Sequence, residues 1–135
     1  MPSSIIVHER LAHWTGLIRP RIAATSTIRW VESRSSADLA SAAFGLSDPI
    51  ALINLAARPY WGLEGLDALN QIAPNALTLV LDPDSVPDVP IIARELGATL
   101  VWSGVVVPPR VEALIRLWLT VLEQRRKQIY RPQAR

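Results

Sequence analysis

Polar side chains that could do chemistry follow three of the short apolar runs in this sequence. His8 and Glu9 come directly after the first run. Asn54 and Asp82 each follow a later one. Carboxylates can hold a cation or move a proton, and imidazole can act as acid or base near neutral pH. These residue types could therefore support metal-assisted or acid–base chemistry.

Glu9, Asp82 and Asp84 could converge on a cation, which would make the protein a small metal-dependent enzyme that uses Glu9 and Asp82. However, both aspartates lie in an Asp-Pro-Asp-Ser stretch, a composition common in turns, and this favours a structural role. His8 and His13 could form an acid–base pair, but they are five residues apart across a strand-to-helix junction, which is not a ligand spacing. We interpret both as ordinary histidines and predict no metal site.

The common catalytic and cofactor motifs are absent from the sequence. It contains no cysteine, no phosphate-binding or dinucleotide-binding glycine pattern and no Gly-x-Ser-x-Gly motif. Tyr60 and Trp61 could contact a flavin, but only an analogy between folds supports that idea. We therefore predict that the protein is not an enzyme and uses no cofactor.

The elements that must position these residues alternate between two hydrophobic periods. Ser35 with Asp38 predicts the start of the second helix, and Gly45 predicts its end. Strict alternation predicts an α/β domain with a five-stranded parallel sheet in the flavodoxin-like order 2-1-3-4-5 and helices on both faces. The predicted strands are 5–7, 28–32, 49–53, 76–81 and 99–102, and the predicted helices are about 11–22, 35–44, 63–72, 90–96 and 108–127.

Length and composition indicate one domain with a sizeable core. The chain has 135 residues, of which 50% are apolar and 19% charged. Residues 123–135 hold five of the 14 basic residues and one of the 12 acidic residues, which leaves nine basic and eleven acidic residues elsewhere. We assign residues 1–127 to the domain and 128–135 to a basic C-terminal tail. A slightly acidic body does not favour nucleic acid as a partner.

Neither a secretory signal nor an apolar stretch of membrane-spanning length is visible. We therefore expect a soluble, cytoplasmic protein that does not act at a membrane.

Four features together resemble the receiver domains of response regulators. After the third predicted strand comes Asn54, and Gly62-Leu63-Glu64 follows eight to ten residues later. Receivers carry an aspartate and a Gly-x-Glu at that spacing. Residues 93–98 read Ala-Arg-Glu-Leu-Gly-Ala, similar to the receiver stretch before strand five, and Pro108-Pro109 stands where receivers have Lys-Pro. The resemblance covers nearly the whole chain and implies the fold predicted above.

The residues that carry phosphorylation chemistry in receivers are replaced here. Receivers hold Mg²⁺ with acidic residues after strand one, where this chain has His8 and Glu9, and imidazole is a poor ligand for that cation. The phosphoacceptor aspartate corresponds to Asn54, whose amide cannot form an acyl phosphate.

Two further receiver roles are missing as well. The hydroxyl position after strand four holds Leu81, unless Ser85 reaches in from the loop. The lysine position falls on Gly104 or Val107, and the only lysine of the chain is Lys127. We therefore expect a degenerate receiver pocket without phosphotransfer, made of His8, Glu9, Asn54, Leu81, Asp82, Gly104 and Val107.

The last predicted helix is apolar on two faces, which indicates two partners. One face is predicted to pack on the sheet, through Val111, Leu114, Ile115, Trp118 and Leu122. The other carries Ala113, Leu117 and Val121, and Trp102 lies nearby in the fifth strand. We predict that these four residues form an interface with a protein partner or a second copy. Arg125, Arg126 and Lys127 are interpreted as a solvated helix end.

The sequence therefore predicts a phosphorylation-independent pseudo-receiver that acts in signal transduction through protein–protein interaction or dimerisation. The alternatives are the metal-dependent enzyme that uses Glu9 and Asp82, and a nucleic-acid-associated protein that acts through the basic tail.

Overall fold

The computed structural model describes residues 3–22 and 27–130 and contains the predicted parallel sheet. The strands lie in the order β2-β1-β3-β4-β5, and every neighbouring pair is parallel. The predicted order is therefore confirmed. The strands are β1 (Ser3–His8), β2 (Ile28–Ser33), β3 (Ile50–Asn54), β4 (Leu77–Asp82) and β5 (Leu100–Ser103).

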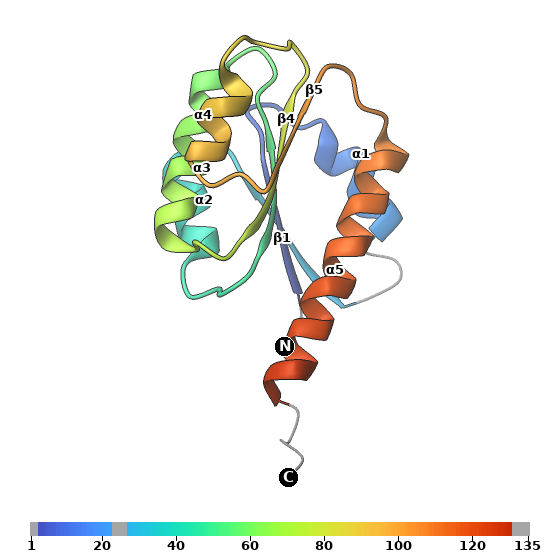
Figure 1. Ribbon diagram of the computed structural model, residues 1–135. Coiled ribbons are helices and arrows are strands. Elements are labelled where there is room, and N and C mark those ends of the chain that lie inside the picture. The colour runs from blue at the N-terminus through green and yellow to red at the C-terminus, as the bar shows by residue number, and fades with distance from the viewer. Residues whose placement is uncertain (1–2, 23–26, 131–135) are drawn as a thin grey trace.

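Helices cover both faces of the sheet (Figure 1). Two of them lie on one face, α1 (Trp14–Ile22) and α5 (Pro108–Tyr130). The other three lie on the opposite face, α2 (Ser36–Ala43), α3 (Pro59–Ile72) and α4 (Val89–Glu95). The result is a three-layer domain with the sheet in the middle, as strict alternation of strands and helices requires.

The core consists of two apolar clusters, one on each face of the sheet. Alternate residues of a strand point to opposite faces, so Ile5 and Val7 pack toward α1 and α5, while Ile6 packs toward α2 and α3. β3 and β4 are buried along their whole length, as expected for central parallel strands. Four residues of the predicted α5 stripe are buried, Val111, Ile115, Trp118 and Leu122, and Leu114 is partly buried against the same cluster.

Helix boundaries follow local signals at most places. Ser35 caps α2, since its side-chain oxygen accepts a hydrogen bond from the Asp38 backbone N–H at 3.1 Å. α3 begins at Pro59, four residues before the predicted start, because proline fits the first turn, where no backbone donor is needed. α5 continues to Tyr130, three residues beyond the predicted end. The division into a domain and a tail stays a prediction, and residues 131–135 lie outside the described part.

The first helix differs from its prediction. It begins at Trp14 rather than near Leu11, and Leu11 is 78% exposed. Leu17, which continues the same helical spacing of apolar residues, is 37% exposed. The reason is the Glu9 side chain, which binds the backbone where α1 begins and keeps the preceding residues out of the helix. Among the helices described, none has both the length and the apolar character needed to span a bilayer.

Candidate functional site

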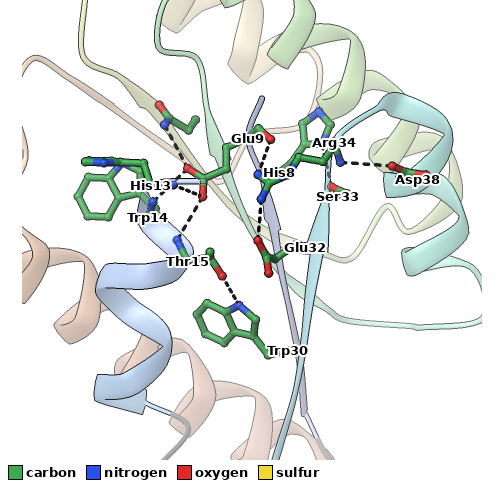
Figure 2. A network of polar contacts seen from close by, with 11 residues as sticks. His8, Glu9, His13, Trp14, Thr15, Trp30, Glu32, Ser33, Arg34 and Asp38 are labelled. Atoms are coloured by element: carbon green, nitrogen blue, oxygen red, sulfur yellow. Dashed lines mark hydrogen bonds and ion pairs between the residues drawn. The ribbon is translucent and has the colours of Figure 1, made fainter. Parts of the chain in front are cut away.

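Glu9 lies at the carboxyl edge of the sheet and caps α1. One carboxylate oxygen accepts hydrogen bonds from the backbone N–H groups of His13, at 3.0 Å, and Thr15, at 3.2 Å (Figure 2). The other accepts from the Trp14 backbone N–H at 3.1 Å. The residue is almost fully buried. Three donors of the helix N-terminus, where the helix dipole is positive, thus converge on one negative group.

Asn54, at the end of β3, completes this arrangement. Its side-chain nitrogen donates to Glu9 at 3.4 Å, and its side-chain oxygen accepts from the Ala56 backbone N–H at 3.1 Å. The structure therefore brings together two of the predicted pocket residues, Glu9 and Asn54. Both the nitrogen and the oxygen of the Asn54 amide form hydrogen bonds, and the position carries no carboxylate.

Asp82 and Asp84 hold the loop after β4. Asp82 is buried, and its carboxylate accepts from the Val86 backbone N–H at 3.0 Å. Burial raises the pKa of Asp82, and the hydrogen bond from Val86 opposes that rise. Asp84 accepts from the Ala57 backbone N–H at 3.1 Å and so ties this loop to the loop after β3. These contacts support the turn interpretation, and no group of three potential metal ligands occurs in residues 3–22 and 27–130.

The remaining positions of the predicted pocket point elsewhere or lack a functional group. Leu81 is buried in the apolar cluster beneath α1 and α5. Gly104 donates its backbone N–H to the Asp82 carbonyl at 2.8 Å and has a positive φ of 86°. The Ser85 side-chain oxygen lies beside it, 3.8 Å from where a Cβ would be. Val107 is 59% exposed. Among the described residues, no hydroxyl or ammonium group forms a hydrogen bond with the Asn54 side chain.

His8 points away from this edge, into the opposite layer. Its imidazole is fully buried, hydrogen-bonds through Nδ1 to the Ser33 side-chain oxygen at 2.8 Å, and stacks on Trp61 with ring centres 4.2 Å apart and planes 4° apart. Among the described residues, Nε2 has no hydrogen-bond partner. Burial lowers the pKa of His8 to about 4, against a small opposing effect of Asp38. His8 is therefore a neutral core residue at neutral pH.

His13 has different neighbours from His8. It is exposed and lies edge-on to Trp14 at 5.7 Å. The structure thus supports two ordinary histidines rather than an acid–base pair.

Arg34 is a further part of the site that sequence analysis missed. Its guanidinium donates to the Glu9 carbonyl oxygen at 2.9 Å and pairs with the Glu32 carboxylate at 2.7 Å (Figure 2). Arg34 thereby ties the end of β2 to the residue that caps α1. No local sequence pattern indicates this contact. Arg34 follows β2, and it comes close to Glu9 only because β2 pairs with β1 in the sheet.

The predicted interface residues lie on the outer side of β5 and α5. Ala113 is exposed, and Leu117 is 57% exposed. Val121 is half-buried, as is Trp102, whose ring lies under the Arg110 guanidinium at 4.1 Å. The four residues thus include two that are well exposed and two that are partly covered by their own chain.

No protein-family model and no curated protein matches this sequence. Solved structures do share its fold. The BeF3-activated DrrB receiver domain superposes with a TM-score of 0.68 at 13% identity, over 89% of this chain and 99% of that one. A CheY-like receiver domain protein from Methanospirillum hungatei JF-1 gives 0.70 at 12% identity, over 93% and 99%. A structure described as adenylate cyclase from Rhodopirellula baltica gives 0.72 at 9% identity, over 98% and 100%.

This chain therefore has the receiver fold, and the resemblance drawn from the sequence is confirmed at that level. Identities of 9–13% show a shared fold alone. The activity has to be argued from the residues of the site.

Proposed function

We propose that this protein is a pseudo-receiver, a cytoplasmic signalling domain that works by binding a protein partner and not by phosphorylation or other catalysis. The observation that supports this most directly is the contact between Glu9 and Asn54. The residue at the phosphoacceptor position is an amide, and the nearest carboxylate is already bound by three backbone N–H groups and that same amide.

A divalent cation would have to compete with these contacts. To bind Mg²⁺, the Glu9 carboxylate would have to give up hydrogen bonds to the first turn of α1, a helix cap that contributes about 0.5–2 kcal/mol. The cation would also sit at the positive end of the α1 dipole. Asp82 is itself engaged, since one of its carboxylate oxygens accepts a hydrogen bond from the Val86 backbone N–H.

The outer side of α5 is the surface that we propose for the partner. Ala113 and Leu117 are exposed on it, and Leu117 is a large apolar side chain of which more than half is exposed. The rest of the helix is anchored through its opposite side by Ile115 and Trp118. A rigid helix with one exposed apolar line is a common form of docking surface.

The test is a thermal-shift titration with Mg²⁺, with and without beryllofluoride, which mimics the acyl phosphate of receivers. We expect that addition of Mg²⁺, with or without beryllofluoride, leaves the Tm of each protein unchanged. This holds for the natural sequence, for Glu9→Gln and for Asn54→Asp, which restores only the carboxylate.

A rise in Tm of the natural sequence with Mg²⁺ and beryllofluoride, absent in Glu9→Gln, would overturn the proposal. A rise confined to Asn54→Asp would instead locate the loss of phosphorylation in that single residue and leave the proposal for the natural chain standing.

A further inference from the structure

The two helical layers carry opposite charge, which the order of charges along the sequence does not reveal. The layer of α1 and α5 holds seven basic and two acidic residues, and the layer of α2, α3 and α4 holds four acidic and one basic. The first set is Arg19, Arg21, Arg110, Arg116, Arg125, Arg126 and Lys127 with Glu112 and Glu123, and the second is Asp38, Glu64, Asp67 and Glu95 with Arg94.

These layers face away from each other across the sheet (Figure 1). On the acidic layer, Glu64 and Asp67 are both exposed and lie three residues apart on α3, so they share one side of that helix. On the basic layer, Arg19 is exposed on α1, and Arg21 of the same helix shares Glu112 of α5 with Arg116. Two cations to one anion leave that cluster positive.

Each charged layer also carries exposed apolar side chains. Leu17 and Leu117 lie on the basic layer, 37% and 57% exposed. Tyr60, Ile72 and Ile91 lie on the acidic layer, 68%, 42% and 62% exposed. Apolar residues among charges of one sign are a composition found at protein interfaces, and they fit a protein surface better than a bare polyanion such as nucleic acid.

Pairing of α5 with the α5 of a second copy would bring two basic helices together. α5 alone holds five basic residues and two acidic ones, so a two-fold contact through it sets like charges against each other, which disfavours that pairing. The acidic layer of another copy instead presents the complementary sign and its own exposed apolar residues.

We propose that this protein associates head to tail, with the basic layer of one copy, α1 and α5, docked on the acidic layer, centred on α3, of the next. The proposal rests on the proposed function, for which it names the partner of the α5 surface as a second copy. Because the two surfaces lie on opposite faces of one domain, the contact does not close into a symmetric dimer and continues into an open chain of copies.

The experiment measures mass against concentration by light scattering and sedimentation, at low and high salt. At about 0.01 M salt the Debye length is about 30 Å, so charges on the two surfaces attract over long distances, and we expect the mean mass to rise with concentration without a plateau. At about 1 M salt the Debye length is about 3 Å, and we expect the monomer.

Two variants break one surface each. The basic-surface variant combines Arg19→Glu with Leu117→Glu, and the acidic-surface variant combines Glu64→Ala with Asp67→Ala. Each alone should be monomeric, with self-association weakened about 100-fold or more. Mixed together, they should form a dimer that grows no further, because the intact acidic surface of one meets the intact basic surface of the other. Arg29→Glu, an exposed position on β2 outside both layers, is the control that should still associate.

A monomer at low salt overturns the proposal, as does self-association that either variant retains, or a mixture of the two variants that stays monomeric. If Leu117→Glu lowers the Tm by more than Arg29→Glu does, the combination of Arg19→Glu with Arg125→Glu replaces it. Failure of this assembly is distinguishable from failure of the proposed function, because the titration with Mg²⁺ and beryllofluoride does not depend on association.

Discussion

At the scale of single residues, Gly65 and His8 show how closely α3 approaches the sheet. A Cβ at position 65 would lie 2.3 Å from Nε2 of His8 and 2.7 Å from its Cδ2, and that imidazole is held between Ser33 and Trp61. We expect Gly65→Ala to lower the free energy of unfolding by about 1–3 kcal/mol, because α3 or the imidazole must shift. Chemical denaturation measures the loss.

The matched control is Gly16→Ala in α1, where a Cβ would meet nothing within 4 Å. Alanine favours helix by up to about 1 kcal/mol over glycine, so this variant should be as stable as the natural chain or more stable. Equal effects at the two glycines would contradict the close packing described here.

His8 should make the fold sensitive to acid. Its pKa is lowered from 6.5 to about 4 by burial, so between these values the unfolded chain binds a proton that the folded chain does not. Stability from the neutral imidazole is complete above about pH 6.5, falls as the pH drops toward 4, and amounts to roughly 3 kcal/mol. A proton on Nε2, which lies close to Gly65, would also find no acceptor within the part of the chain that the structure describes.

The measurement is urea denaturation at pH 7 and pH 4.5 for the natural chain and for His8→Phe. The raised pKa of Asp82 acts in the opposite direction, since its protonated form suits the folded state, but it affects both proteins alike. The difference between the two proteins should therefore shift against the natural chain at pH 4.5. His13→Ala, at an exposed histidine, should follow the natural chain at both pH values.

At the scale of elements, α1 depends on a side chain that precedes it by five residues. Glu9→Ala removes the acceptor of three backbone N–H groups, and we expect a loss of about 2 kcal/mol in the free energy of unfolding. Hydrogen exchange of the amides of residues 13–15 should accelerate. Glu123→Ala, which breaks only an exposed pair with Lys127, should change stability by less than about 0.5 kcal/mol. A similar loss in both variants would show that the cap contributes nothing.

Most elements could be predicted from the sequence because their signals are local. Apolar runs gave the five strands, and Ser35 and Gly45 marked the ends of α2. The start of α1 could not be predicted from apolar spacing. Leu11 continues the helical period, yet it lies before the first turn of α1, which the Glu9 side chain caps.

The site was predictable only in part. Asn54 was found through spacing, but the direction of His8 was not, because its neighbours Ser33, Trp61 and Gly65 come from two other elements. Alternation of side chains along β1 sends His8 and Glu9 to different places, so adjacency in sequence suggested a shared pocket that the fold divides.

At the scale of the whole molecule, α5 links the core to the surface that we propose for docking. Trp118 is buried on one side of the helix and Leu117 is exposed on the other, so adjacent residues separate folding from association. Trp118→Ala should cost about 3–5 kcal/mol of unfolding free energy through the cavity it leaves. Leu117→Asp should change stability by no more than about 0.5 kcal/mol, because the Leu117 side chain is 57% exposed.

Substitution of Leu117 should change association rather than stability. If the outer side of α5 binds a partner, Leu117→Asp should weaken that binding while its Tm stays at the value of the natural chain, because burial of the introduced carboxylate at a contact is costly. Thr120→Asp, at another exposed position one turn along the helix, tests how far the contact extends. Calorimetry together with sedimentation at low salt separates the two effects. Unchanged association in Leu117→Asp would exclude this line of α5 from the contact and direct attention to α1 as the basic surface.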